Sequence, residues 1–418
     1  MSLVTITQSP TLPNGTQADL IYTLTCPNSA DPQFRYICRV KKDTAAGDVI
    51  AQFKQVPNND GIGVFEVSRL IDPAMGYDLS QKTIGFVGST NNNIRTFEIA
   101  FGAVSGSTAT SALSDESINV SASLPPDTIF IPAVVERDAG TFNWDSTAYD
   151  VLTNCPNALG TFNETSAQKA LPVSSSDWLT ISTLQGTIGN NGDLSSMRID
   201  FYNTSFSSVY NYTEANGVSS GTTAGELVHA GVGPKNIETL DATVASYLAD
   251  PTTYPYYSVK LNYASGTSKT YYFENKCYKY KGTNFAFINK LGMFDYYRAS
   301  LVDTENESFN RETYDASYIN YSTDSSTISY DYTTRGETQY YNSFTNTYTA
   351  ETDWLTQEQA DWLFELFESP SVYVQDGNNF VGVVITNANE QYKTNPRGQK
   401  VFKFTIRYRK SNSKRART

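Results

Sequence analysis

Histidine, the side chain that most often serves as a general base or a metal ligand, occurs once in this sequence. His229 stands in the segment Leu227-Val228-His229-Ala230-Gly231. A single histidine excludes a histidine-rich metal site, and no Gly-x-Ser-x-Gly elbow appears near an expected strand-to-helix turn. We therefore expect His229 to lie in a loop or at the edge of a strand, without a catalytic role.

Asp and Glu together number 43, so paired carboxylates for glycoside hydrolysis are an alternative that the sequence leaves open. Such an enzyme needs two neighbouring acids, one of which has a raised pKa. The cluster Asp303, Glu305 and Glu307 does not stand out from the other acids. It also lacks the Gly at position 6 and the Glu at position 12 of a calcium-binding EF-hand loop. We predict no enzymatic activity and no metal site.

The segment Gly231-Val232-Gly233-Pro234-Lys235 does not match a phosphate-binding loop. A Walker loop has the spacing Gly-x-x-x-x-Gly-Lys-Ser/Thr, which lets backbone amides surround the phosphates. Here a proline interrupts the loop, and Asn236 stands where the hydroxyl residue is needed. The segment predicts a turn before a helix, and we expect no cofactor.

The four cysteines, Cys26, Cys38, Cys155 and Cys277, are widely spaced and include no Cys-x-x-Cys pair. They are too few for a disulfide scaffold, so we expect buried free thiols. A bridge between Cys26 and Cys38 across neighbouring strands is the alternative, which a reducing cytoplasm disfavours.

Charge is unevenly distributed along a chain whose net charge is −12. Ten basic and no acidic residues lie between Lys393 and Thr418, whereas positions 1–392 hold 21 basic and 43 acidic residues. An acidic body and a basic end favour contacts between subunits, because opposite potentials steer and orient association. A solvated tail is the alternative, and we do not expect so short a segment to bind nucleic acid.

The 29 tyrosines and 22 phenylalanines fit half-buried strands as well as assembly interfaces. Intramolecular core is the simpler explanation for any one of these rings. We select as candidate assembly residues the basic end together with two tyrosines of a polar, Tyr-rich stretch at 310–350. The candidates are Arg407, Arg409, Lys410, Lys414, Arg415, Arg417, Tyr340 and Tyr341.

A mean hydropathy of −0.40 and the lack of an apolar run of about 20 residues predict that the chain has no membrane span. The first five residues show neither the basic nor the apolar part of a secretion signal, so none is expected.

Residues 1–122 are predicted to form short strands separated by turns. Alternating apolar and polar residues at 34–40 and 97–101 indicate strands, and Asn58-Asn59-Asp60-Gly61 indicates a turn. This pattern favours an immunoglobulin-like β-sandwich. Pro125-Pro126 marks its expected boundary with the next domain.

Residues 123–275 are predicted to form a β domain with one helix. A hairpin is expected to join 179–181 to 197–201 through the turn at 189–192, and a second to join 259–263 to 271–273. The helix is expected at 236–249, where Asn236 could cap its start and Pro251 would end it.

Residues 276–418 begin with an aromatic run at 285–297, followed by the Tyr-rich stretch. This stretch has few aliphatic residues, so it is predicted to be an extended arm that orders on a partner. Thr356 and Gln359 occupy capping-box positions before a helix that ends at Pro370, and two strands are expected at 380–385 and 402–409.

Three stretches resemble virion proteins of tailed phages that infect Bacteroidetes, in particular neck and tail proteins of the crAss-like group. The stretches are GIGVFEVSRL at 61–70, FAFINKLGMFDYY at 285–297 and LTQEQADWLFELFESPSVY at 355–373. They occur in order along the chain, which favours a common architecture. The resemblance implies a component of the neck, collar or tail rings, with no catalytic residue to carry over.

We therefore predict a mainly β chain with a multi-domain β-sandwich architecture, an immunoglobulin-like N-terminal domain and a few short helices. The expected function is that of a structural ring subunit located in the virion and assembled in the host bacterial cytoplasm. Its expected partners are copies of itself and neighbouring portal, tail or collar proteins. The alternative is a receptor-binding or capsid-decorating virion protein that recognises host surface glycans.

Overall fold

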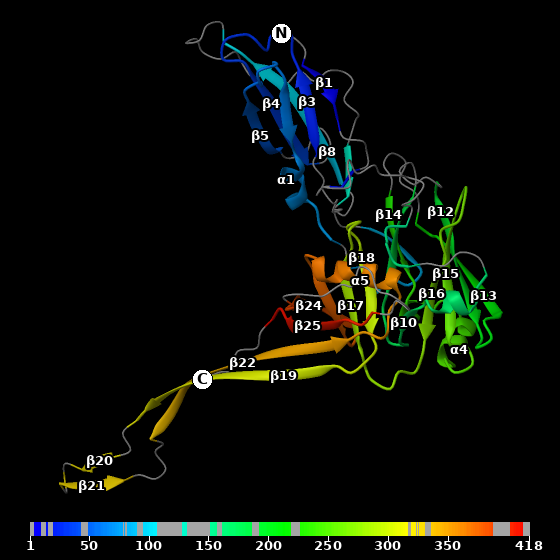
Figure 1. The fold of residues 1–418 in the computed structure, drawn as a ribbon, viewed down its shortest axis with the longest axis vertical. Coiled ribbons are helices and arrows are strands. Elements are labelled where there is room, and N and C mark those ends of the chain that lie inside the picture. The colour runs from blue at the N-terminus through cyan, green and yellow to red at the C-terminus, as the bar shows by residue number, and fades with distance from the viewer. Residues whose placement is uncertain are drawn as a thin grey trace. The chain divides into compact units, whose positions relative to one another are not determined.

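The structure is a computed structural model that describes most of the chain. The described residues are 4–9, 14–15, 20–42, 49–77, 79, 82–89, 95–106, 128–131, 151–156, 161–185, 192–218, 226–316, 319–322, 324, 326–330, 336–387 and 402–412. Strands account for 51% of the structure and helices for 12%, which confirms the predicted mainly β class (Figure 1).

The chain divides into two compact units, and each is discontinuous in sequence. Unit 1 comprises Met1–Cys277, Ala286–Tyr297 and Thr356–Pro370. Unit 2 comprises Tyr278–Phe285, Arg298–Leu355 and Ser371–Thr418. The three domains suggested by the sequence, 1–122, 123–275 and 276–418, stay a prediction.

Two sheets of unit 1 are built mainly from the first hundred residues. Their strand orders are β1-β3-β6 and β2-β9-β8-β4-β5. The strands are β1 (Thr5–Gln8), β2 (Asn14–Gly15), β3 (Ile21–Thr25), β4 (Arg35–Lys42), β5 (Val49–Gln55), β6 (Gly63–Glu66), β8 (Arg95–Val104) and β9 (Thr128–Ile131). The short helices α1 (Ser68–Ile71) and η1 (Asp72–Ala74) follow β6. The strands predicted at 34–40 and 97–101 are confirmed as parts of β4 and β8.

One aromatic core joins these two sheets. The ring of Tyr22 on β3 lies 5.2 Å from the ring of Phe101 on β8, and the ring of Phe65 on β6 lies 5.9 Å from the same phenylalanine. Gly61, in the predicted turn, has φ of 76°, a conformation that glycine adopts without strain. Its carbonyl accepts a hydrogen bond from the Tyr36 hydroxyl at 2.7 Å, so the turn is tied to the core.

Two further sheets form the middle of unit 1, with the orders β11-β14-β7 and β10-β16-β15-β12-β13. The strands are β7 (Phe86–Gly88), β10 (Leu171–Val173), β11 (Thr180–Gln185), β12 (Leu194–Tyr202), β13 (Ser208–Ala215), β14 (Glu226–Gly231), β15 (Tyr256–Tyr263) and β16 (Tyr271–Asn275).

The first predicted hairpin, between 179–181 and 197–201, is wrong. β11 pairs with β14, whereas β12 pairs with β13 and β15. Every residue of β11 is buried, while β12 alternates between buried and more exposed positions, so the two strands suit different sheets. The second predicted hairpin is confirmed, because β15 and β16 pair in antiparallel fashion and Val259 lies opposite Tyr271.

The predicted helix at 236–249 is divided in two, and the described part of 123–275 has three short helices rather than one. They are α2 (Glu164–Ala167), α3 (Pro234–Ile237) and α4 (Ala242–Ala249). Asp241 caps α4 by accepting hydrogen bonds from the backbone of Thr243 and Val244, so a new helix starts there. Asn236 is no cap. Its buried side chain accepts a bond from Leu179 N at 2.8 Å and donates one to Thr83 O at 2.7 Å.

The predicted C-terminal helix is confirmed as α5 (Gln357–Glu368). Gln359 N donates to the Thr356 hydroxyl at 3.3 Å, and Thr356 N donates to Gln359 Oε1 at 3.0 Å, which completes the capping box. The aromatic run at 285–297 forms most of β17 (Thr283–Ile288) and β18 (Phe294–Ala299), and the division between the units passes through both strands.

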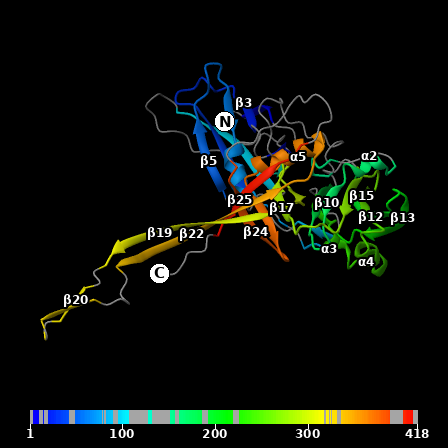
Figure 2. The same cartoon turned by 60° about the horizontal axis from the view of Figure 1, so that its bottom comes forward.

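Five strands of unit 2 are neighbours in one sheet, in the order β23-β24-β25-β22-β19. They are β19 (Thr304–Asp315), β22 (Glu337–Glu351), β23 (Val372–Asp376), β24 (Asn379–Ile385) and β25 (Thr405–Lys410), and a small hairpin of β20 (Ile319–Ser322) and β21 (Thr327–Tyr330) lies between β19 and β22 in sequence. The two predicted closing strands are confirmed as β24 and β25. The Tyr-rich stretch consists largely of β19 and β22, which run out from the rest of this sheet (Figure 2).

Candidate interaction site on the β19–β22 ribbon

The structure places five of the eight candidate assembly residues, all of them in unit 2. Tyr340 and Tyr341 lie on β22, and Arg407, Arg409 and Lys410 lie on β25. Lys414, Arg415 and Arg417 are outside the described residues. β22 and β25 are neighbours, but their pairing covers only 348–351 of β22, so the two tyrosines lie beyond the part of the strand that β25 reaches.

β19 and β22 form a long two-stranded ribbon. Their antiparallel pairing runs from Thr304 opposite Thr349 to Asp315 opposite Glu337, with an irregularity at Glu312. Among the described residues, β19 has no strand on its outer side, and β22 has none beside it from 337 to 347. A ribbon of two strands is marginally stable in water by itself, and unpaired edges readily accept another strand. The ribbon therefore has the properties of a surface that a partner covers.

The two faces of the ribbon differ in chemistry because side chains alternate along each strand. One face carries Glu305, Glu307 and Phe309 opposite Tyr348, Asn346 and Phe344. The other carries hydroxyl and amide side chains, namely Thr304, Asn306 and Ser308 opposite Thr349, Thr347 and Thr345. Every residue of β19 is exposed, so neither face forms a core.

Large rings are exposed along the ribbon. Phe309, Tyr314 and Tyr340 are each 52% exposed, and Tyr341 is 43% exposed. The Tyr340 hydroxyl donates a hydrogen bond to Glu312 Oε2 at 2.6 Å, and this carboxylate raises the pKa of the phenol. The predicted tyrosines are thus available for contact, in company with aromatic residues that the sequence did not single out.

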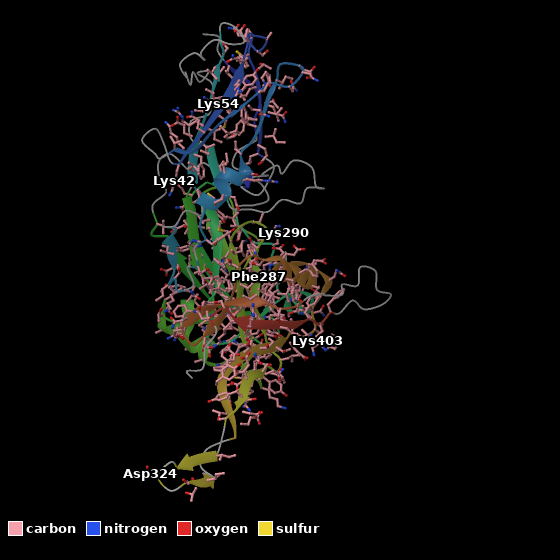
Figure 3. The ribbon with its side chains drawn as sticks, turned by 90° about the vertical axis from the view of Figure 1, so that its left-hand side faces the viewer. Lys42, Lys54, Phe287, Lys290, Asp324 and Lys403 are labelled. Carbon is pink, nitrogen blue, oxygen red and sulfur yellow. The ribbon has the colours of Figure 1, made fainter. Side chains whose placement is uncertain are left out.

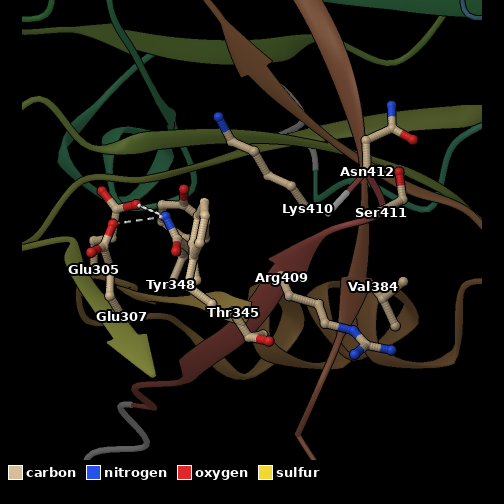
Figure 4. A pocket seen from close by; sticks show the side chains of 11 residues that line it. Glu305, Glu307, Thr345, Tyr348, Val384, Arg409, Lys410, Ser411 and Asn412 are labelled. Carbon is tan, nitrogen blue, oxygen red and sulfur yellow. Dashed lines mark hydrogen bonds between the residues drawn. The ribbon is translucent and has the colours of Figure 1, made fainter. Parts of the chain in front are cut away.

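A groove of about 580 Å³ lies where β25 ends beside the ribbon (Figure 4). Its lining residues are Glu305, Glu307, Phe344, Thr345, Asn346, Tyr348, Val384, Arg409, Lys410, Ser411 and Asn412. Asn346 Nδ2 donates to Glu305 at 2.7 Å and to Glu307 at 3.4 Å, which holds the two carboxylates together on the ribbon side of the groove. The groove therefore combines charges of both signs with amide and hydroxyl groups.

The basic residues of β25 are not equivalent. Lys410 Nζ donates to Asp376 at 3.0 Å, and this ion pair raises the pKa of Lys410 and lowers the pKa of Asp376. Lys410 also lies 5.7 Å from the centre of the Tyr348 ring. Arg407 and Arg409 are exposed. The two arginines are therefore better placed than Lys410 to meet a partner.

His229 lies inside β14, between β11 and β7, so its predicted position in a loop or at a strand edge is wrong. The imidazole is 1% exposed, and its Nδ1 lies 2.8 Å from the hydroxyl of Ser182, which is also buried. A substrate has no access to so buried a pair, and the absence of a catalytic role stays a prediction.

The four cysteines are free thiols. Cys26 and Cys38 are buried as predicted, Cys155 is partly buried, and Cys277 is exposed, so the prediction of burial is wrong for Cys277. Burial raises the pKa of Cys38 to about 12, which keeps this thiol protonated and unreactive.

A buried polar network in unit 1 was not apparent from the sequence. Asp295 is buried, and one of its oxygens accepts a hydrogen bond from Trp362 Nε1 at 2.7 Å. Glu365, one turn along α5 from Trp362, accepts bonds from Asn154 Nδ2 and Lys290 N, both at 2.9 Å. Burial raises the pKa of Asp295 to about 7 and also raises that of Glu365. The one related signal in the sequence is the capping box, which predicts the start of α5, the helix that carries Trp362 and Glu365.

Within the ranges that the structure describes, no group of three or more His, Cys, Asp or Glu side chains could hold a metal ion. No helix in those ranges is long and apolar enough to cross a membrane. No protein-family model matches the chain, and a search of curated proteins finds no significant similarity.

Proposed function

We propose that this chain is a structural subunit of a tailed-phage particle, a ring protein of the neck, collar or tail that works through protein–protein contacts. The observation that carries the proposal is the β19–β22 ribbon: every residue of β19 is exposed, and among the described residues the outer edge of β19 and positions 337–347 of β22 have no partner strand. An exposed, long edge strand is normally protected in a monomeric protein, because it templates association. A subunit whose edges are covered by its neighbours has no need of that protection.

The ribbon favours a ring over an isolated dimer. The outer edge of β19 and the free edge of β22 are different surfaces. When either edge pairs with a different surface of a neighbouring copy, the contact is heterologous. Such contacts repeat from copy to copy and close into a ring when the rotation allows. The exposed Arg407 and Arg409 provide opposite charge for an acidic neighbour, such as a portal, tail or collar protein.

The N-terminal part of unit 1 supports the same proposal as a contact module. Its two sheets share one aromatic core, and we propose that it is an immunoglobulin-like β-sandwich. Free cysteines fit assembly in the reducing cytoplasm of a host bacterium before the chain enters the virion.

Removal of the ribbon tests this function. Residues 308–345 are replaced by Asn-Gly, so that Glu307 and Asn346 are joined by a tight turn. The matched control replaces only 316–336 by Asn-Gly, which removes the β20–β21 hairpin and keeps the ribbon. Each purified chain is added to particles that lack the protein, and its incorporation is measured by quantitative mass spectrometry.

We expect the ribbon deletion to reduce incorporation at least tenfold and the control deletion to leave it nearly unchanged. Thermal unfolding of both variants establishes that unit 1 remains folded. Equal incorporation of the two variants, with unit 1 intact, would contradict a structural role for the ribbon.

A receptor-binding or capsid-decorating role is the alternative, and the groove at the end of β25 favours it. Planar amide and carboxylate groups such as Asn346 and Glu307, near an aromatic ring, are suited to hydrogen-bond sugar hydroxyls. A host-cell binding assay separates the two functions. Asn346→Ala should abolish cell binding if the groove recognises a glycan, and should leave ring formation intact.

A further inference from the structure

A cluster of cations lies on the sheet that contains β4 and β5, although the chain as a whole is acidic. Arg35 and Arg39 are four residues apart on β4, and Lys54 of β5 lies opposite Ile37, between them. At about 3.3 Å per residue, the two arginines are roughly 13 Å apart along the strand. Tyr36, the neighbour of Arg35, points into the aromatic core, so the three cations extend from the other face of the sheet.

These cations are exposed or nearly so. Arg35 and Lys54 are exposed, and Arg39 is partly exposed. Arg39 Nε donates to Gln52 Oε1 at 2.8 Å, which orients the guanidinium group. A fourth base on this face, Lys41, pairs with Glu98 at 3.4 Å. Figure 3 labels Lys54 and Lys42 on the strands of this sheet. We refer to Arg35, Arg39 and Lys54 as the basic face.

Next to the basic face is a strand edge that has no partner strand in the described part of the chain, and exposed aliphatic groups lie along it. β5 is the last strand in the order of its sheet. Val49, Ile50 and Val56 on or beside β5 are 51%, 37% and 63% exposed. Exposed aliphatic groups near both ends of β5, beside three cations and a strand edge without a described partner, give this region the composition of a binding surface.

The ribbon has the complementary composition. Between Thr304 and Thr349 the sequence contains seven acidic residues, two arginines and no lysine. Glu312, Asp315 and Glu337 are exposed near the far end of the β19–β22 pairing, and the exposed rings of Tyr314 and Tyr340 lie among them. The acids and aromatic rings of the ribbon are thus complementary, in charge and in apolar character, to the bases and aliphatic groups of the basic face and the β5 edge.

We propose that the basic face and the β5 edge of one copy receive the acidic ribbon of a second copy. This inference rests on the proposed function, since it names the surface on which the ribbon docks. The two surfaces belong to different parts of the chain, so each copy offers one of each and the contact propagates to the next copy. Opposite potentials accelerate the encounter and set its register, and salt weakens both effects.

Charge reversal in two matched sets tests the pairing. The face set is Arg35→Glu, Arg39→Glu and Lys54→Glu, and the ribbon set is Glu312→Lys, Asp315→Lys and Glu337→Lys. The control set, Lys276→Glu, Lys279→Glu and Lys281→Glu, changes the charge as much as the face set does, at three other exposed lysines. Self-association of each full-length chain is measured by analytical ultracentrifugation at low and high salt, and far-ultraviolet circular dichroism checks folding.

The face set and the ribbon set should each weaken self-association at least tenfold, and the control set should change it less than threefold. Mixing the two sets restores complementary charge at every contact, as does combining them in one chain, so both arrangements should recover association to within about threefold of the wild type. Recovery also shows that the single sets are folded.

The proposal is overturned if mixing gives no recovery, if the single sets associate like the wild type, or if the wild type stays monomeric at its highest soluble concentration. A ribbon deletion that blocks incorporation into particles while charge reversal has no effect would leave the proposed function standing and reject this docking surface. Binding of the basic face to nucleic acid, with no effect on self-association, would likewise reject it.

Discussion

Two acids of unit 1 and the acids of β19 in unit 2 occupy opposite environments. In unit 1, Asp295 and Glu365 are buried within a hydrogen-bonded network, with Trp362 as one donor. In unit 2, the acids of β19, such as Glu305 and Glu312, are exposed. A buried acid affects the free energy of unfolding through desolvation, whereas an exposed acid is well hydrated and affects mainly association. The contrast sets a buried acidic network, which bears on stability, against an exposed acidic strand, which covers no core.

Replacement of Trp362 by alanine should lower the free energy of unfolding more than any other substitution considered below. The indole is 3% exposed, lies 5.7 Å from the ring of Phe287 and donates to Asp295. Its removal leaves a cavity and takes one of the hydrogen-bond donors from a buried carboxyl group, so we expect the free energy of unfolding to fall by about 3–5 kcal/mol. Urea unfolding, followed by near-ultraviolet circular dichroism, measures the change.

Trp354→Ala provides the matched control, because this tryptophan is 68% exposed. Its loss should not shift the urea midpoint measurably. If the two substitutions lower the free energy of unfolding equally, the network around Trp362 does not anchor α5, contrary to what the geometry indicates.

Asp295→Asn should change how stability depends on pH. The folded-state pKa of about 7 lies above the ordinary value, because desolvation disfavours the charged form. The native state therefore binds more protons than the unfolded state between about pH 4 and pH 7, and wild-type stability falls as the pH rises through this interval. The slope approaches about 1.4 kcal/mol per pH unit at most.

The asparagine variant should lose most of this slope and become more stable than the wild type at pH 8. Glu365, whose pKa is also raised, keeps a smaller slope of the same sign in the variant. Urea midpoints at pH 5, 6, 7 and 8 make the comparison, and parallel profiles for the two chains would show that Asp295 is already ionised in the folded protein.

Sequence patterns predicted elements whose signals are local. The capping box at Thr356 and the alternation at 402–409 gave α5 and β25, and the turn at Gly61 was also identified. The pairing of β11 with β14 depends on residues about fifty positions apart, and no local pattern reports such a choice. His229 was misplaced for the same reason, since its burial depends on strands contributed by two other segments.

The candidate site was predicted only in part. The excess of tyrosine and the basic end indicate β22 and β25 as contact candidates, but the low aliphatic content of 310–350 does not predict two long paired strands. Hydrophobic alternation indicates a strand that has a core to cover, and β19 covers none. The sequence does not predict the basic face, because Arg35, Arg39 and Lys54 are dispersed in sequence and become neighbours only when β4 pairs with β5.

Thr356→Ala should lower the free energy of unfolding less than Trp362→Ala does and more than Phe309→Ser does. The hydroxyl accepts the Gln359 amide at the start of α5, and without it a backbone donor of the first turn loses its partner. We expect a loss of about 1 kcal/mol in the free energy of unfolding, measured from urea midpoints. Thr356→Ser retains the hydroxyl and is the control, so a similar loss in the serine variant would mean that the methyl group, not the cap, matters.

Phe309→Ser should have the smallest effect on stability and a large effect on association. The ring is 52% exposed on β19, opposite Phe344, and it covers no core, so the urea midpoint should stay within the error of the measurement. An exposed aromatic ring on an unpaired ribbon contributes most of its area when a partner covers it, as anchors do at protein interfaces. Sedimentation should then show weaker self-association for the variant at unchanged stability. A variant that unfolds more easily but associates normally would reverse the contrast between the two units, because the ribbon would then be part of the fold and not of the contact.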